Sequence, residues 1–246
     1  MTGRREAYLR ELGIPLWVQR GGSAVQLPPD GAGTQASVEE RPAAFEGGAV
    51  AAERPAADAR NPAEAWAELR SEIRACTRCA LHRGRTQAVV GVGRENAELL
   101  VIGEAPGAEE DRQGEPFVGP AGQLLNAMLR SIGFARTDVY IANILKCRPP
   151  NNRDPRPEEA ETCTPFLERQ VALIRPRAIL AVGRIAAQWL LQSDAPIGRL
   201  RGRVQQFREI PLVVTYHPAY LLRTPLAKAT AWQDLCMLKR VLAERR

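Results

Sequence analysis

The sequence contains few of the features that would place it in a membrane, outside the cell or on a disulfide scaffold. No apolar run approaches the roughly 20 residues that span a bilayer, and the first residues lack the apolar core and cleavage site of an export signal. Lysine occurs at only three of the 246 positions, histidine at two and cysteine at five. Five cysteines in a reducing compartment argue against a disulfide framework. We expect a cytoplasmic protein without a membrane anchor.

The scarcity of lysine leaves arginine to supply 31 of the 34 basic residues, in a chain of formal net charge +6 and pI near 9.4. Arginine's planar donor fork suits phosphate, and a basic balance is typical of proteins that bind nucleic acid. An arginine-rich proteome would produce the same composition, so charge alone leaves both explanations open.

The composition changes near residue 60 and divides the chain into three parts. Residues 21–61 are rich in glycine, alanine and proline, without a sustained apolar period, and are predicted to form a disordered linker. Residues 1–20 form a short amphipathic segment, which favours a docking peptide; packing back onto its own globule is the alternative. Residues 62–246 are long enough to form one globular domain.

Apolar runs and helical patterns alternate along this domain. Asn61 followed by Pro62 predicts the start of a helix that runs toward Cys76. Strands are expected at 99–102, 139–145, 178–182 and 212–215, and further helices at 121–132, 157–174, 184–191 and 225–242. This order predicts an α/β fold, a three-layer α/β/α arrangement around a central four-stranded parallel sheet.

Four cysteines are candidate metal ligands. Cys76 and Cys79 are spaced so that both thiolates can hold one metal centre or form a redox pair. Cys147 follows the second expected strand, and Cys163 lies within a helix. Zinc and a 4Fe–4S cluster both accept four thiolates, and buried structural thiols are a further alternative. Cys236 lies on an apolar helix face and is expected in the core.

Unusual residues gather where the expected strands end, the edge at which such sheets bind ligands. A glycine- and proline-rich turn from Gly103 to Gly107 follows the first strand, and its backbone amides are positioned to meet a ligand. Asn143, at the end of the second strand, offers both a hydrogen-bond donor and an acceptor on one side-chain amide. His217 follows the fourth strand beside Pro218; the other histidine, His82, lies near the first cysteine pair.

Taken in order, these elements resemble the family 4 uracil-DNA glycosylases, the iron–sulfur members of their superfamily. The resemblance extends from about Ala65 to the end of the chain. It is carried by the four cysteines and by the segments Gly103–Gly107, Pro116–Gly119 with Ala121-Gly122, Asn143–Pro150 and His217-Pro218. It implies a 4Fe–4S cluster with a structural role on Cys76, Cys79, Cys147 and Cys163, and a glycosylase-like fold.

The resemblance also implies an activity, namely hydrolysis of the N-glycosidic bond of deoxyuridine in DNA at the start of base excision repair. Phe117 would stack on the flipped base, Asn143 would bind its edge and reject cytosine, and His217 would stabilise the uracil anion. Family 1 enzymes carry a water-positioning aspartate where this chain has Ala105, a gap that family 4 shares. The remaining implied roles are a uracil pocket at Ala105 and Gly107, water orientation by Glu104 or Glu110, and DNA contacts from a loop carrying Leu221, Leu222 and Arg223.

The N-terminal segment has a resemblance of its own. Arg4 to Trp17 looks like the N-terminal arm of the psi subunit of bacterial DNA polymerase III, which docks on the clamp loader. The partners expected are therefore uracil-containing DNA and, through residues 1–20, a clamp-loader or other replisome component, for a chain that is itself a monomer. The alternative function is a non-catalytic replisome subunit that retains the fold and the cluster.

Overall fold

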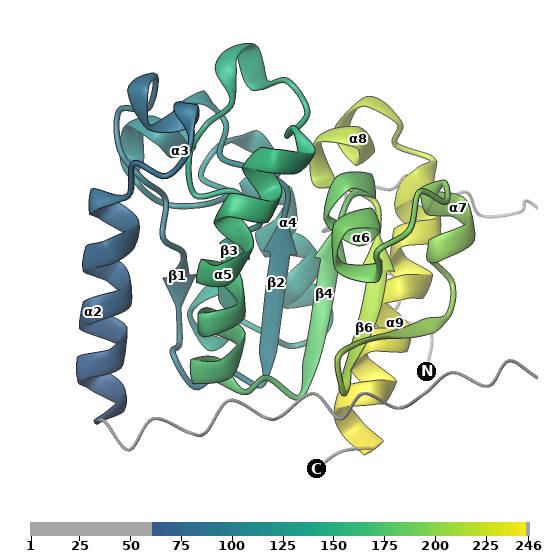
Figure 1. The fold of residues 1–246 in the computed structure, drawn as a ribbon. Helices are drawn as coiled ribbons and strands as arrows, with labels where there is room; N and C mark the ends of the chain where they lie inside the picture. The colour runs from purple at the N-terminus through teal and green to yellow at the C-terminus, as the bar shows by residue number, and fades with distance from the viewer. Residues whose placement is uncertain (1–60, 245–246) are drawn as a thin grey trace, which may run out of the picture. The chain divides into compact units, whose positions relative to one another are not determined.

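The computed structural model describes residues 61–244 and shows a six-stranded sheet in the order β1-β3-β2-β4-β6-β5. The four inner strands pair in parallel, and the short strand at each edge pairs antiparallel with its neighbour (Figure 1). The strands are β1 (Val92–Gly93), β2 (Leu99–Gly103), β3 (Tyr140–Asn143), β4 (Ala178–Val182), β5 (Val204–Phe207) and β6 (Ile210–Thr215). The predicted docking segment and linker, apart from Asn61, lie outside the described residues.

Eight α-helices and three short 3₁₀ helices surround the sheet in the described part of the chain. The α-helices are α2 (Pro62–Ala75), α3 (Ala108–Gln113), α4 (Pro120–Ser131), α5 (Pro157–Ile174), α6 (Arg184–Leu191), α7 (Ile197–Leu200), α8 (Pro218–Arg223) and α9 (Ala227–Glu244). The 3₁₀ helices are η1 (Ala80–Arg83), η2 (Arg136–Asp138) and η3 (Pro150–Asn152).

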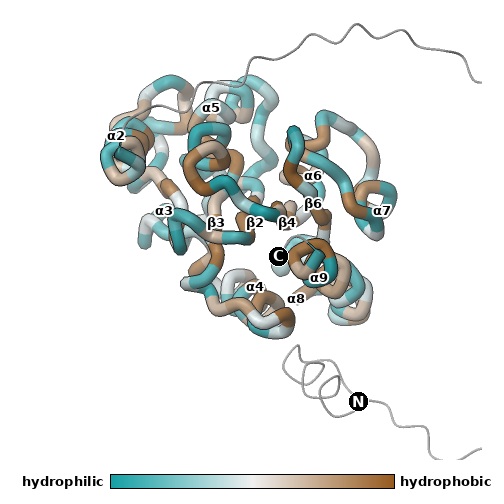
Figure 2. Tube along the Cα trace, turned by 90° about the horizontal axis from the view of Figure 1, so that it is seen from below, coloured by the Kyte–Doolittle hydropathy of each residue, from teal (hydrophilic) through white to brown (hydrophobic). Residues whose placement is uncertain are grey.

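Helices cover both faces of the sheet, which confirms the three-layer α/β/α prediction. Helices α5 and α6 lie over one face, while α4 and α9 lie over the other (Figure 1). Seen along the strands, apolar positions gather between these layers (Figure 2). Two buried clusters result, one on each face, because strands covered on both sides must be apolar throughout.

Capping hydrogen bonds explain where helices α2 and α5 begin. The side chain of Asn61 accepts a hydrogen bond from the backbone N–H of Ala63 (3.1 Å) and caps α2, as predicted. The carboxylate of Glu159 accepts a hydrogen bond from the backbone N–H of Arg156 (2.9 Å), which caps the start of α5. Between their caps, the major helices follow the apolar pattern of the sequence closely, and so do the four parallel strands.

The structure differs from the prediction at several points: β3 ends at Asn143 rather than at residue 145, and the short helices α3 and α7 were not predicted. Strand β1 is only two residues long and β5 has the mixed sequence Val-Gln-Gln-Phe, so neither edge strand forms an apolar run that sequence reading detects. The segment after His217, predicted as a loop, is the short helix α8 with Pro218 at its first position. The last helix begins at Ala227 rather than at Pro225.

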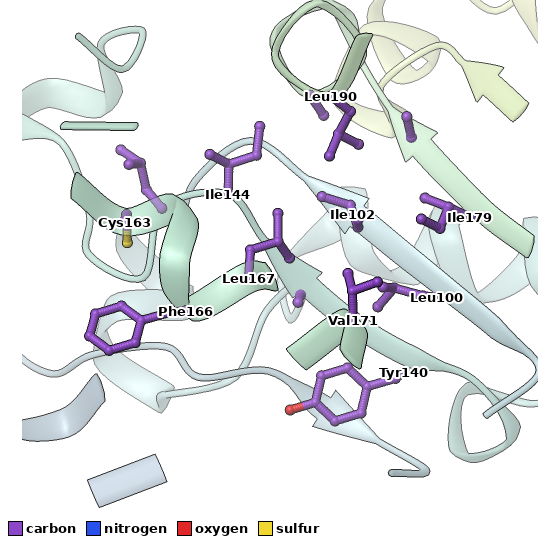
Figure 3. Close-up of a cluster of buried hydrophobic side chains, with 14 of the residues drawn as sticks. Leu100, Ile102, Tyr140, Ile144, Cys163, Phe166, Leu167, Val171, Ile179 and Leu190 are labelled. Carbon is purple, nitrogen blue, oxygen red and sulfur yellow. The ribbon is translucent and has the colours of Figure 1, made fainter. Parts of the chain in front are cut away.

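Helix α5 connects the sheet to the cysteines. Its residues Phe166, Leu167 and Val171 pack beside Tyr140 and other strand side chains in the cluster on that face, and Cys163 lies at one end of this group (Figure 3). The face of α5 that forms the core thus also carries a candidate metal ligand. Among the described helices, none has the length and apolar character of a membrane span.

Candidate active site and metal centre

Three of the predicted site segments meet at the carboxyl-end edge of the parallel strands. Gly103, the last residue of β2, pairs in register with Asn143, the last residue of β3. On the other side of the sheet centre, Val182 of β4 pairs with Thr215 at the end of β6, two residues before His217. The topology therefore brings Asn143 and His217 to one edge, as expected for a parallel sheet.

Asn143, Phe117 and Gly103 converge at this edge. The Asn143 side chain is 2% exposed, and its Oδ1 atom has no hydrogen-bond partner within the described residues. A side chain at Gly103 would collide with both Asn143 Oδ1 and the Phe117 ring, so the absence of one lets the amide and the ring approach. An unpaired buried acceptor is costly. The Oδ1 atom is therefore available to accept a hydrogen bond from a ligand.

Phe117 is held in an unusual backbone conformation. Its φ is 54°, a left-handed value that a bulky residue rarely adopts, and its side chain is buried. The fork of Arg136 donates to the carbonyl oxygens of Pro116 (2.6 Å) and Phe117 (3.3 Å). A side chain at Gly122 would collide with the Phe117 carbonyl. Strained positions of this kind persist where surrounding contacts over-determine them, often at functional sites.

His217 faces the same space. Its ring centroid lies 5.7 Å from that of Phe117. Its Nδ1 accepts a hydrogen bond from the backbone N–H of Ala219 (3.2 Å) and caps α8. Burial lowers the pKa of His217 to about 4, the positive charge of Arg223 acts in the same direction, and Glu110 opposes them. The ring is therefore neutral at physiological pH, with Nδ1 occupied as an acceptor and its proton on Nε2.

The two acidic residues predicted to orient water have different environments. Glu110 accepts backbone N–H groups on both oxygens, from Gly107 (3.2 Å), Val118 (3.0 Å) and Gly119 (3.4 Å). It therefore secures the loop around Phe117. Burial raises the pKa of Glu104 to about 7; Asp154 adds to the increase and Arg184 opposes it. A carboxyl group titrating near neutrality at a strand end is suited to proton or water chemistry.

The two residues predicted to line the uracil pocket, Ala105 and Gly107, also differ in their environments. Ala105 is half-buried against the core cluster at the end of β2. The backbone N–H of Gly107, by contrast, donates to Glu110 and so is not directed at a ligand. Of these two predicted pocket residues, Ala105 keeps a position compatible with its predicted role.

The predicted DNA-contacting residues lie on α8, and the helix separates them. Leu221 is 1% exposed and packs in the core beneath the helix, because successive helical positions face different sides. Leu222 is 45% exposed, and Tyr220 and Arg223 are also exposed. The expectation for Leu221 is therefore corrected: in this structure its side chain is not available to DNA, and Leu222 presents the apolar surface.

The four predicted metal ligands line one small pocket beside α5. Cys76 caps the end of α2, Cys79 precedes η1, and Cys147 and Cys163 are buried. Two N–H groups point at sulfur: Arg85 Nη1 donates to Cys147 (3.0 Å), and the Lys146 backbone donates to Cys163 (3.3 Å). His82 lines the pocket too, but its Nδ1 donates to the Cys79 carbonyl (2.7 Å).

The donor set of this pocket is suited to a metal centre. Burial raises the pKa of the Cys163 thiol to about 11, although the Lys146 ammonium acts against the increase. A bound metal would supply the positive charge that such thiolates require. Four thiols line this common pocket, a donor set that both zinc and a 4Fe–4S cluster accept.

Sequence reading missed three residues that support these sites, namely Arg136, Arg85 and Lys146. Arg136 and Arg85 have no local pattern that distinguishes them from the other arginines of the chain. Lys146 carried a detectable signal, since it is one of only three lysines and interrupts an apolar run just before Cys147. Its side chain is 1% exposed, which sequence alone did not suggest.

Comparison with known proteins gives a consistent result. Residues 90–236 match the model of the uracil DNA glycosylase superfamily. A type-4 uracil-DNA glycosylase of Archaeoglobus fulgidus is 48% identical over 170 residues, 66% of this chain and 85% of that protein. Type-4 enzymes of Pyrobaculum aerophilum (43%, covering 69% and 91%) and Thermotoga maritima (45%, covering 63% and 83%) are similar to comparable extents.

Proposed function

The chain belongs to the uracil-DNA glycosylase superfamily and, within it, to the type-4 enzymes, and from this premise we propose how its residues divide the work of releasing uracil. The activity is hydrolysis of the N-glycosidic bond that joins uracil to deoxyribose in DNA, the first step of base excision repair. This membership favours an enzyme over a non-catalytic replisome subunit. A uracil-containing oligonucleotide that is cut by alkali after incubation with the protein provides the direct test.

Asn143 selects the base, and its unpartnered Oδ1 is the observation that carries this assignment. Uracil presents an N–H donor beside a carbonyl acceptor, which match the Oδ1 and Nδ2 atoms of an asparagine. Cytosine presents an acceptor beside an amino group and would leave both partners unsatisfied. The flipped base stacks on Phe117, and such stacking contributes about 1–3 kcal/mol toward the cost of extrusion.

His217 stabilises the leaving group. As the glycosidic bond breaks, uracil departs as an anion whose charge spreads onto its carbonyl oxygens. The Nε2–H group of a neutral His217 is a fixed donor at the pocket, and its direction is set by the α8 cap on Nδ1. A pre-aimed donor of this kind lowers the barrier in the manner of an oxyanion hole.

Glu104 orients or activates the attacking water, and pH dependence tests this role. Because the pKa of Glu104 is raised to about 7, its carboxylate form is lost as the pH falls below 7. We expect kcat/KM to fall about tenfold per pH unit below pH 7 and to be level above it. His217, with a pKa of about 4, adds no step between pH 5 and 8. Glu104→Gln should give a low, flat profile, whereas an unchanged wild-type step in this variant would contradict the role.

Glu110 and Arg136 together hold the loop that presents Phe117. Glu110 binds the backbone N–H groups that follow Phe117, and Arg136 binds the carbonyl groups at Pro116 and Phe117 itself. The peptide groups on both sides of the strained residue are therefore fixed before the base arrives, so less ordering remains when it binds. We assign both residues to positioning rather than to water activation.

DNA contact falls to the exposed side of α8. Leu222 and Tyr220 are large exposed apolar residues beside the pocket, and the exposed Arg223 lies next to them. An apolar side chain can fill the space that a flipped base leaves in the stack, and arginine can bind the phosphates at its edge.

A 4Fe–4S cluster on the four cysteines would join α2, the end of β3 and α5, and when bound it supplies structural bracing rather than redox chemistry. We expect Cys163→Ser to lose the visible thiolate-to-iron absorption and to lower Tm by about 10 °C or more, because metal binding adds to the free energy of folding. Cys236→Ser, at a half-buried cysteine outside the pocket, is the matched control. A colourless wild-type protein that contains zinc would overturn the assignment.

Residues 1–20 are proposed to tether the enzyme, a monomer, to a clamp-loader subunit. The support is the sequence of the arm alone, since these residues lie outside the described part. A pull-down with clamp-loader subunits should lose the enzyme when residues 1–20 are deleted; retention at the wild-type level would refute the tether. A cytoplasmic location is proposed because the described cysteines form no disulfide and the cluster ligands must stay reduced.

A further inference from the structure

Lys146 lies between the uracil pocket and the cysteine pocket. Its ammonium group donates to the backbone carbonyl of Asn143 (2.6 Å) and to Oε1 of Gln170 on α5 (2.7 Å). Gln170 in turn donates to the carbonyl of Val90 (2.8 Å) and to the hydroxyl of Tyr140 (3.4 Å). All the side chains of this network are buried, so the network fixes the end of β3 from beneath.

The backbone of the same residue contacts the cysteine pocket. The Lys146 N–H donates to the sulfur of Cys163, and the next residue in the chain is the ligand Cys147. The Lys146 carbonyl accepts from the N–H of Val89 (2.7 Å). Five residues of chain, Asn143 to Cys147, therefore contain the proposed base-selecting asparagine, a buried lysine and a candidate cluster ligand.

A buried lysine requires a reason, because burying an ammonium group is costly unless it is compensated by charge or hydrogen bonds. Two neutral acceptors satisfy part of its bonding capacity. A methionine would fill the same space at lower cost but would donate a hydrogen bond to neither Asn143 nor Gln170.

We propose that Lys146 is a positioning residue that couples the cysteine pocket to uracil recognition, because its side chain holds the backbone carbonyl of Asn143 while its own backbone N–H binds the sulfur of Cys163. The proposal rests on the role given to Asn143 above. It predicts that disturbing Lys146 impairs the step that depends on Asn143 and also loosens the cluster, although the lysine contacts no substrate.

A double-mutant cycle tests the coupling to Asn143. Single-turnover rates of uracil release are measured for Lys146→Met alone, with Asn143→Ala and with His217→Ala. We expect Lys146→Met to slow release by about 10- to 100-fold in the wild-type and His217→Ala backgrounds, as the loss of a buried charged hydrogen bond implies. In the Asn143→Ala background we expect a loss of no more than about threefold.

The cluster is examined separately from activity. The Lys146→Met protein should lose its visible absorption to an iron chelator about 10- to 100-fold faster than wild type, the usual scale for changes beside metal ligands. The exposed Lys239→Met is the matched control and should equal wild type in both measurements.

Two results would overturn the proposal. One is an equal slowing by Lys146→Met in the Asn143→Ala and His217→Ala backgrounds, which would make Lys146 a general stability residue. The other is a wild-type rate for Lys146→Met. If Asn143→Ala itself were fully active, the role of Asn143 would fail instead, so the two failures are distinguishable. Should Lys146→Met not fold, Gln170→Leu removes one acceptor of the ammonium group and should show the same pattern at about 3- to 10-fold.

Discussion

Replacing His217 with asparagine is expected to lower the single-turnover rate of uracil release by about 10²- to 10³-fold, the usual effect of removing one pre-aimed donor. Asparagine is a strong helix N-cap, so its side chain can accept the Ala219 N–H as Nδ1 of His217 does. The shorter side chain does not place a donor where Nε2 lies. The variant thus separates the catalytic role of His217 from its structural role in α8.

The controls for this prediction depend on the hydrogen bond by which His217 caps α8. His217→Ala loses both functions and should be at least as slow as His217→Asn, with a lower Tm. Affinity for DNA containing uracil should change little in either variant, because neither substitution replaces a residue on the exposed side of α8. A His217→Asn enzyme with the wild-type rate would show that the Nε2–H group does not stabilise the leaving base.

Apolar periodicity was sufficient to predict the parallel sheet and its major helices. Runs such as 99–102 and 178–182 are apolar at every position, because helices cover both faces of the sheet. Strand-end placement then predicted that Asn143 and His217 would share an edge, which the register confirms. Sequence reading did not predict the two edge strands, because side chains at a sheet edge need not be apolar. Strands β1 and β5 therefore carry no periodic apolar signal.

What the sequence could not provide was the direction of individual side chains within loops. The helical geometry of α8 places Leu221 in the core and Leu222 at the surface, a distinction that requires knowing that the segment is helical. Likewise, Glu110 resembles a catalytic acid in the sequence, yet both its oxygens bind backbone N–H groups. Such contacts arise from tertiary packing between segments, and no local pattern encodes them.

The residues proposed to act on the base and the four cysteines lie in different parts of the structure. Phe117, Asn143 and His217 meet above the strand ends, while the cysteines lie to one side, beside α5. The segment from Asn143 to Cys147 belongs to both sites. Under the roles proposed above, the position of the Asn143 amide therefore depends on the cysteine pocket.

Asn143→Ala is expected to lower the rate of uracil release by about 100-fold or more. Two hydrogen bonds to the base edge would be lost in a buried site, each contributing about 1–3 kcal/mol, and every 1.4 kcal/mol is a factor of ten. Discrimination against cytosine should also weaken, since a polar site rejects a mismatched base through the partners it would leave unpaired. Parallel single-turnover assays on oligonucleotides carrying uracil or cytosine at one position measure both effects.

The matched control is Asn96→Ala, which removes an exposed asparagine whose side chain accepts only a surface hydrogen bond from Arg94 (2.9 Å). It should leave the rate, the selectivity and DNA binding unchanged. Equal losses of DNA binding and of cleavage in Asn143→Ala would count against base selection, because the amide lies in the pocket and not on the surface that meets the duplex. Loss of turnover with retained affinity for the duplex is the result that the buried, unpaired Oδ1 atom predicts.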